Sequence, residues 1–178
     1  WPRTYASNLV ASEGEFIVNG YVKVAKTGQI TVVVPEVETG QGAFTLFAQI
    51  VADELGADWR AVGVEAAPIN PLYGNEAAWS DWPDMASALP FSGPPPQLTD
   101  EAFAPMVFET RAREAGAAAR AMLCMAAAKR WGADWRACEC GTASCLQRAQ
   151  IGKTGGTRPQ TGGEEALAGT EVVFVAVG

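Results

Sequence analysis

The pattern of apolar and polar positions begins with two stretches that are rich in β-branched residues. Residues 16–25 and 30–37 are predicted to be two strands, joined by a turn over residues 26–29 that contains Gly28. The segment Ile30–Val34 is apolar on both faces, which is typical of a buried strand. A third strand is predicted over residues 62–67.

Two segments have the periodicity of helices. Residues 43–55 alternate between an apolar face and a polar face every three to four positions, and Gly56 is expected just past the helix end. Residues 109–131 are rich in alanine and apolar nearly all round at their centre, so we expect a second helix that is buried on most sides. Gly-Ala-Asp-Trp-Arg-Ala follows each helix, at 56–61 and at 132–137, and predicts similar helix-to-strand corners.

Two longer segments lack periodicity, and we predict irregular structure over residues 76–108 and 139–163. Residues 171–177 are a last candidate strand. The predicted fold class is therefore α+β, with mixed strands and two main helices in one domain.

Composition narrows the class of protein. The 178 residues are 48% hydrophobic and 19% charged, which is typical of a globular chain. A net charge of -7 argues against binding to nucleic acid or to an anionic membrane surface. No apolar run is long enough to cross a bilayer. The chain begins at Trp1 without an export signal, so we expect either a removed leader or a start inside a longer protein. The compartment stays unknown.

The absence of histidine removes the commonest general base and the commonest metal ligand. Three of the four cysteines form C-x-C-x4-C, namely Cys138, Cys140 and Cys145. This spacing matches neither common zinc sites nor ferredoxin motifs, so we predict ordinary thiols and no bound metal. Disulfides are compatible with the composition, but the spacing alone does not predict a pairing.

The short loop between the second strand and the first helix carries Gly40, Gln41 and Gly42. A glutamine amide offers two N–H donors and does not ionise near neutral pH. Glycines on both sides let the backbone approach a bulky ligand, and the helix N-terminus that follows favours an anionic group. An ordinary strand-to-helix turn would look the same, so the motif alone leaves both interpretations open.

A longer stretch of sequence supports the ligand interpretation. Residues 30–42 (ITVVVPEVETGQG) and 52–75 (ADELGADWRAVGVEAAPINPLYGN) resemble the molybdopterin-binding subunit of the xanthine dehydrogenase and aldehyde oxidase family. Residues 113–134 and the closing EVVFVAVG are also similar to its isoquinoline 1-oxidoreductase beta-subunit branch. The resemblance covers residues 16–75 and 109–138 well and the remainder poorly.

The resemblance implies an incomplete molybdopterin-binding domain, over residues 1–178, that forms the N-terminal part of an oxidoreductase large subunit. Gly40, Gln41 and Gly42 would be the cofactor-binding residues, with Gln41 donating to an oxo ligand of molybdenum–molybdopterin in the complete subunit. The expected partners are the remainder of the large subunit, an iron–sulfur subunit and a small-molecule substrate, an aldehyde or an N-heterocycle. No catalytic residue is expected here, because the family's catalytic glutamate lies far towards the C-terminus.

Two departures leave an alternative open. The segment rich in glycine, serine and threonine that this branch carries before its second helix is not visible, since residues 91–108 bring prolines and acids instead. Residues 139–163 match nothing that the family predicts. The chain could therefore be a non-catalytic α+β binding or assembly module that keeps part of the scaffold. Glu36 and Glu38, beside the loop, are expected to be solvated carboxylates.

Overall fold

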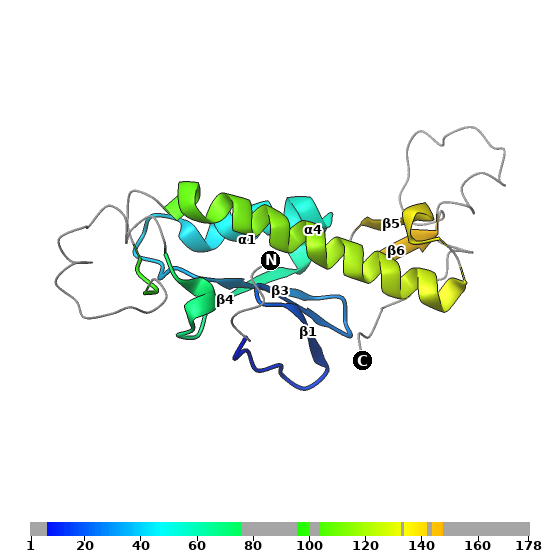
Figure 1. The fold of residues 1–178 in the computed structure, drawn as a ribbon, viewed down its shortest axis with the longest axis horizontal. Helices are drawn as coiled ribbons and strands as arrows, with labels where there is room; N and C mark the ends of the chain where they lie inside the picture. Colours follow the sequence, from blue (N-terminus) through cyan, green and yellow to red (C-terminus); the bar gives the residue numbers. More distant parts are fainter. Residues whose placement is uncertain (1–6, 76–95, 100–103, 133, 142–143, 148–178) are drawn as a thin grey trace.

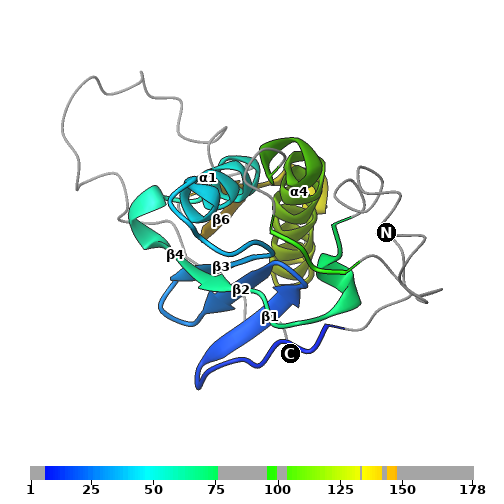
Figure 2. The same cartoon turned by 90° about the vertical axis from the view of Figure 1, so that its left-hand side faces the viewer.

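A computed structural model describes residues 7–75, 96–99, 104–132, 134–141 and 144–147. A four-stranded mixed sheet forms one layer, and two long helices lie side by side on one of its faces (Figures 1 and 2). A separate two-stranded sheet sits near the C-terminal half of the second helix. This arrangement confirms the predicted α+β class.

The larger sheet has the order β1-β2-β3-β4. Its strands are β1 (Glu15–Asn19), β2 (Val22–Ala25), β3 (Ile30–Val34) and β4 (Val62–Ala66). The first three strands pair antiparallel, and β4 pairs parallel to β3. Since α1 (Ala43–Leu55) connects β3 to β4, these three elements form a βαβ unit.

The predicted single strand over residues 16–25 is wrong, because the chain reverses near Gly20. The side chain of Asn19 accepts a hydrogen bond of 2.9 Å from the backbone N–H of Tyr21 and so closes an Asx turn. The turn makes β1 and β2 a hairpin instead of one strand. In contrast, β3 is buried as predicted, since every residue except Thr31 is nearly inaccessible to solvent.

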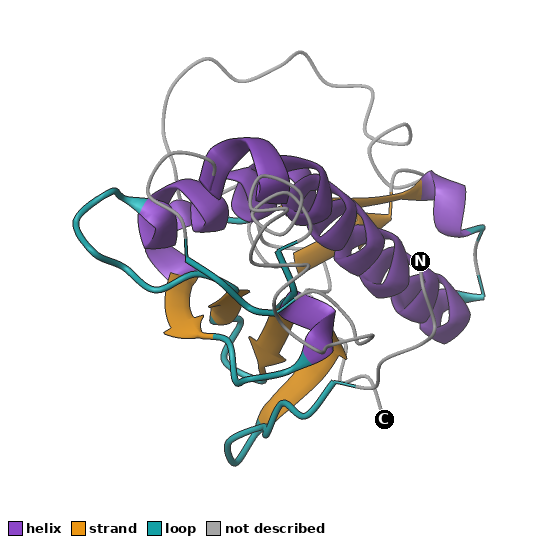
Figure 3. Ribbon diagram, turned by 60° about the vertical axis from the view of Figure 1, so that its left-hand side comes forward, coloured by secondary structure: helices purple, strands orange, loops and turns teal. Residues whose placement is uncertain are grey.

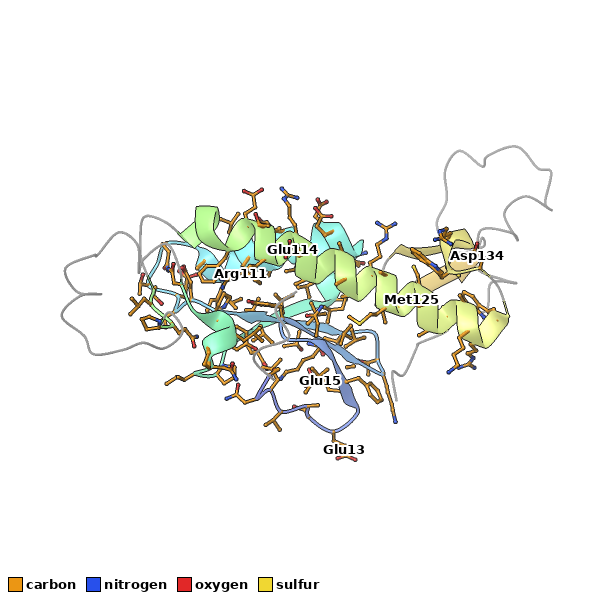
Figure 4. The ribbon with its side chains drawn as sticks, in the orientation of Figure 1. Glu13, Glu15, Arg111, Glu114, Met125 and Asp134 are labelled. Carbon is orange, nitrogen blue, oxygen red and sulfur yellow. The ribbon has the colours of Figure 1, made fainter. Side chains whose placement is uncertain are left out.

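The first helix has the predicted bounds, and the second, α4 (Ala104–Trp131), begins five residues before the predicted start. Each helix is followed by a glycine in the left-handed region, Gly56 with φ 75° and Gly132 with φ 63°. The two helices pack against each other through small residues of α4, which leaves them close together. The opposite face of α4 is open to solvent, as Met125 shows in Figure 4, so this helix is less enclosed than predicted.

The main hydrophobic core lies between the helices and the sheet. Its largest members come from the β1–β2 turn, β3, α1, the 3-10 helix Pro71–Tyr73 and the start of α4. They are Tyr21, Ile30, Val32, Val33, Val34, Phe47, Val51, Leu55, Tyr73 and Phe108. Lys23 of β2 links the N-terminal segment to the sheet. Its Nζ donates to the Val10 carbonyl at 2.8 Å and lies 2.6 Å from a carboxylate oxygen of Glu65 in β4. Glu15 lies on the side of the sheet away from the helices (Figure 4).

The repeated hexapeptide folds the same way twice, as predicted. After each helix a short 3-10 turn forms, at Trp59–Ala61 and at Trp135–Ala137. Asp58 and Asp134 each accept a 3.0 Å hydrogen bond from the backbone N–H two residues later. The corners lead into β4 and β5 respectively.

The second corner leads into a hairpin that we did not predict. It is formed by β5 (Cys138–Gly141) and β6 (Ser144–Gln147), which pair antiparallel. The expectation of irregular structure over residues 139–163 is therefore wrong for these strands. The same expectation for residues 76–108 is wrong for residues 104–108, which belong to α4. The candidate strand at residues 171–177 lies outside the described residues.

Candidate functional site

The β3–α1 loop, residues 35–42, lies at the carboxyl end of β3, where the parallel neighbour β4 also ends. In sheets of this kind, ligands bind beyond the carboxyl ends of parallel strands. Figure 3 shows the long helices as a layer beside the strands, with loops connecting the two. The predicted turn at Gly40, Gln41 and Gly42, with a helix starting at Ala43, is confirmed as local structure.

Both glycines of the loop have backbone conformations that other residues rarely adopt. Gly40 has φ 102° and Gly42, the residue that precedes α1, has φ 83°. A Cβ added at either position would meet no atom within 4 Å. The glycines are therefore required by the backbone turn rather than by packing, and open space remains beside the loop.

The side chain of Gln41 is held by its own loop. Its Oε1 accepts hydrogen bonds from the Thr39 backbone N–H at 2.6 Å and from Thr39 Oγ1 at 2.8 Å. Its Nε2 donates to the Val37 carbonyl at 2.8 Å. A glutamine amide has two N–H bonds, and the second one has no acceptor among the described residues. One oriented neutral donor is therefore left for a ligand.

Glu38 occupies the donors that we expected to receive an anionic ligand. Its Oε1 accepts from the backbone N–H groups of Gly40 and Gly42 at 2.8 and 3.0 Å, and its Oε2 accepts from that of Phe44 at 3.0 Å. The hydrogen bonds from Gly42 and Phe44 are the main reason that the pKa of this carboxyl lies below its ordinary value. The helix N-terminus is thus capped from within the chain.

The expectation of solvated carboxylates is therefore confirmed for Glu38 and wrong for Glu36. Glu38 is exposed but works as a cap, and Glu36 is only 2% exposed. The sequence did contain a signal for Glu38, since acidic residues are favoured near the start of a helix. The burial of Glu36, directly after Pro35, has no comparable local signal.

An open cavity of about 460 Å³ adjoins the loop. Its wall is mostly apolar and comes from the β3–α1 loop, from the chain after β4 and from residues 96–99. The lining residues are Pro35, Val37, Ala67, Ile69, Asn70, Pro71, Pro96, Gln97 and Thr99. Val37, whose carbonyl accepts from Gln41, is one of these lining residues, so Gln41 is hydrogen-bonded to a residue of the wall.

Residues 96–99 are joined to the loop by long-range hydrogen bonds, although we predicted only irregular structure there. Thr99 Oγ1 accepts from the Val37 backbone N–H at 2.9 Å, and Gln97 Nε2 donates to the Pro35 carbonyl at 3.0 Å. Gln97 Oε1 also accepts from the Asn70 backbone N–H at 3.4 Å. These polar side chains of the cavity were missed, because no local pattern marks contacts between residues so far apart in sequence.

Other candidate chemistry is limited in the described part of the chain. Among the described residues there is no cluster of three or more histidine, cysteine, aspartate or glutamate side chains that could hold a metal ion. The side chains of Cys140 and Cys145 are outside that description, so the metal prediction stays open for them. No helix within the described residues has the length and apolarity to span a membrane.

Comparison with known proteins gives this geometry a context. Residues 5–70 match the molybdopterin cofactor-binding domain family. The chain is 36% identical over 114 residues to isoquinoline 1-oxidoreductase subunit beta of Brevundimonas diminuta, which covers 64% of this chain and 13% of that protein. It is 34% identical over 73 residues to a membrane-bound aldehyde dehydrogenase (pyrroloquinoline-quinone) of Gluconacetobacter polyoxogenes, covering 39% of this chain and 9% of that protein. The chain thus spans about an eighth of the first relative and less of the second.

Proposed function

Because this chain belongs to the molybdenum hydroxylase family and its cofactor is molybdenum–molybdopterin, we propose that its β3–α1 loop forms one wall of the cofactor pocket. Gln41 is the residue that contacts the cofactor, and Gly40 and Gly42 leave the space for it. One observation carries the proposal: the Gln41 amide is fixed by three hydrogen bonds and keeps one N–H that no described residue accepts.

The Gln41 side chain fits a molybdenum cofactor, whereas the start of α1 does not fit a phosphate group of that cofactor. The Gln41 amide is a neutral N–H donor, and the two glycines beside it have open surroundings. It can therefore donate a hydrogen bond to an acceptor on the cofactor without ionising. The start of α1 does not suit a phosphate, because the Glu38 carboxylate already accepts from the backbone N–H groups of Gly42 and Phe44 and places a negative charge there. When bound, the molybdenum cofactor supplies the redox chemistry.

The role of this chain is then to position the Gln41 donor and to orient it towards the cofactor. The hydrogen bonds from Thr39 hold the Gln41 carbonyl oxygen, so the N–H that remains has a fixed direction before the cofactor arrives. A preorganised donor needs no rearrangement when charge develops nearby, which is the condition under which one hydrogen bond contributes most to catalysis.

The proposed function of the complete subunit is based on the two relatives. Residues 1–178 are a partial molybdopterin-binding domain from the N-terminal portion of a large subunit that oxidises aldehydes or N-heterocycles. The remainder of that subunit completes the pocket, and an iron–sulfur subunit receives the electrons. The names of the two relatives, an isoquinoline oxidoreductase subunit and an aldehyde dehydrogenase, support both substrate classes.

Replacing Gln41 in the complete subunit tests the proposal. Gln41→Ala should lower kcat by about 10²–10³, with molybdenum and pterin contents unchanged, because one preorganised donor is lost. Thr39→Val is the matched control, since it removes a hydrogen bond to the Gln41 carbonyl oxygen but leaves the donor, and it should lower kcat much less. Full turnover in Gln41→Ala with a normal molybdenum content would contradict the role of Gln41, and a complete subunit that contains no molybdenum or pterin would contradict the function.

A further inference from the structure

The β5–β6 hairpin places two cysteines directly opposite each other. Cys140 is the register partner of Cys145, next to the Gly141–Ser144 pair that precedes the two-residue connection. The C-x-C-x4-C spacing left open whether any disulfide forms. The register of the two strands decides which residues are neighbours.

Backbone geometry favours this pair over the other pairings that involve Cys138. Residues opposite each other in an antiparallel ladder have Cα atoms about 4.5 or 5.5 Å apart, and a disulfide needs about 4.4–6.8 Å. Cys138 is diagonal to Cys145, a relation that separates Cα atoms by roughly 7–8 Å. Cys138 and Cys140 are two positions apart along one strand, roughly 6.4–6.8 Å, at the far limit of that range.

The other two cysteines are engaged elsewhere. Cys124 and Cys138 are buried thiols, 5% and 7% exposed. Cys124 Sγ lies 3.8 Å from the Cys138 carbonyl oxygen, and Cys138 Sγ lies 3.8 Å from that of Asp134. Burial, assisted by the Asp134 carboxylate, raises the pKa of the Cys138 thiol. Cys138 is therefore a poor nucleophile in thiol–disulfide exchange.

We propose that Cys140 and Cys145 form an intramolecular cross-strand disulfide that joins β5 to β6 under oxidising conditions. The oxidant is a low-molecular-weight disulfide. A thiolate of one cysteine attacks it to give a mixed disulfide and release one small thiol, and the second cysteine then displaces the other small thiol. Two S–H bonds are lost, one S–S bond forms in the protein, and the two electrons reduce the small disulfide to two thiols.

Peptide mapping of the 178-residue chain tests this pairing. The native protein is equilibrated with oxidised glutathione, quenched with acid, unfolded and alkylated with iodoacetamide. Trypsin cleaves after Arg136 and Arg148, so residues 137–148 form one peptide with three cysteines. We expect this peptide to carry a single alkylation, at Cys138, and to be lighter than the unbridged, triply alkylated peptide by the two carbamidomethyl groups that Cys140 and Cys145 would otherwise carry. Cys124, in the peptide of residues 121–129, should be alkylated.

Single variants separate this pairing from its alternatives. Cys138→Ser should keep the bridge and lose the alkylation. Cys140→Ser and Cys145→Ser should each give a peptide without an internal bridge, in which Cys138 is alkylated and the cysteine left without its partner is either alkylated or still carries one glutathione. Three alkylations in the oxidised wild-type peptide, a bridge that includes Cys138, or a dimer that reductant dissolves would each overturn the proposal. So would stoichiometric zinc or iron that is released when the thiols are blocked. The chain oxidised in denaturant is the reference, and a native sample with the same mixture of pairings would also count against the proposal.

Discussion

Replacing Gly116 with alanine tests the close packing of α4 against α1. A Cβ at this position of α4 would lie 2.7 Å from the Val51 carbonyl oxygen and 2.8 Å from Glu54 Cβ of α1. Ordinary contacts begin near 3.4 Å, so the two helices would have to separate by about 0.7 Å. A gap of ~0.5–1 Å loses a quarter to a half of the dispersion energy between the atoms that face it.

Two effects of opposite sign compete in Gly116→Ala. Alanine has the higher helix propensity and would stabilise an open helix position by about 1 kcal/mol. Overpacking costs about 1–3 kcal/mol, and here the obstacle is largely the backbone of α1, which cannot rotate aside as a side chain can. Because backbone atoms block the new methyl group, we take the overpacking cost in the upper part of that range, about 2–3 kcal/mol, and expect a net loss of about 1–2 kcal/mol in the free energy of unfolding.

Thermal unfolding followed by circular dichroism measures this balance. A loss of that size should lower Tm by roughly 2–8 °C for a chain of this length. Ala117→Gly, at the exposed neighbouring position, is the control and should cost about 1 kcal/mol from helix propensity alone. An increase of Tm in Gly116→Ala would refute the close helix contact, because propensity would then outweigh packing.

Three further predictions concern charge and activity. The pKa of the Glu38 carboxyl lies below its ordinary value of 4.5, so its contribution to stability is complete above that pH and is lost as the pH falls through the lowered pKa of the folded state. Denaturation midpoints of wild type and Glu38→Gln should therefore differ at neutral pH and converge in acid, and a constant difference would contradict the cap. Lys23→Met should cost about 2–4 kcal/mol in chemical denaturation, because it leaves Glu15 and Glu65 uncompensated, and Glu65→Gln in the same chain should recover part of that loss. The isolated 178 residues should not oxidise aldehydes or N-heterocycles when supplied with molybdenum cofactor and an artificial electron acceptor, and steady reduction of the acceptor would contradict this expectation.

The parts of the fold with local signals were predictable from the sequence. The first helix was predicted to the residue, because its apolar period is regular and glycines stand at both ends. The two hexapeptide corners were also predictable, since an aspartate that caps its own turn needs no distant partner. The reversal at Asn19 has a local cause, but the β-branched residues on both sides of it led to the prediction of one continuous strand.

The errors arose where distant residues decide the structure or where one residue type has two uses. Residues 104–108 were predicted to be irregular, yet α4 begins at Ala104 with Pro105 in its first turn, where proline is tolerated because its missing N–H has no partner to lose. The β5–β6 strands contain few β-branched residues, so local propensity gave no signal for their pairing. Within the candidate site, the loop was predicted, whereas its contacts with residues 96–99 were not.

The capping of α1 by Glu38 changes what the loop can recognise. A helix N-terminus usually attracts anions because its N–H groups lack partners, but here the carboxylate of Glu38 accepts from three of the backbone N–H groups around it. A second anion beside that carboxylate would meet like charge, so the donor that remains for a ligand is the uncharged amide of Gln41. The loop therefore suits an acceptor with little net charge, and we expect the phosphate of the cofactor to be bound by residues outside this loop. Phosphate protection of the loop amides from hydrogen exchange in the isolated chain would contradict this division of roles.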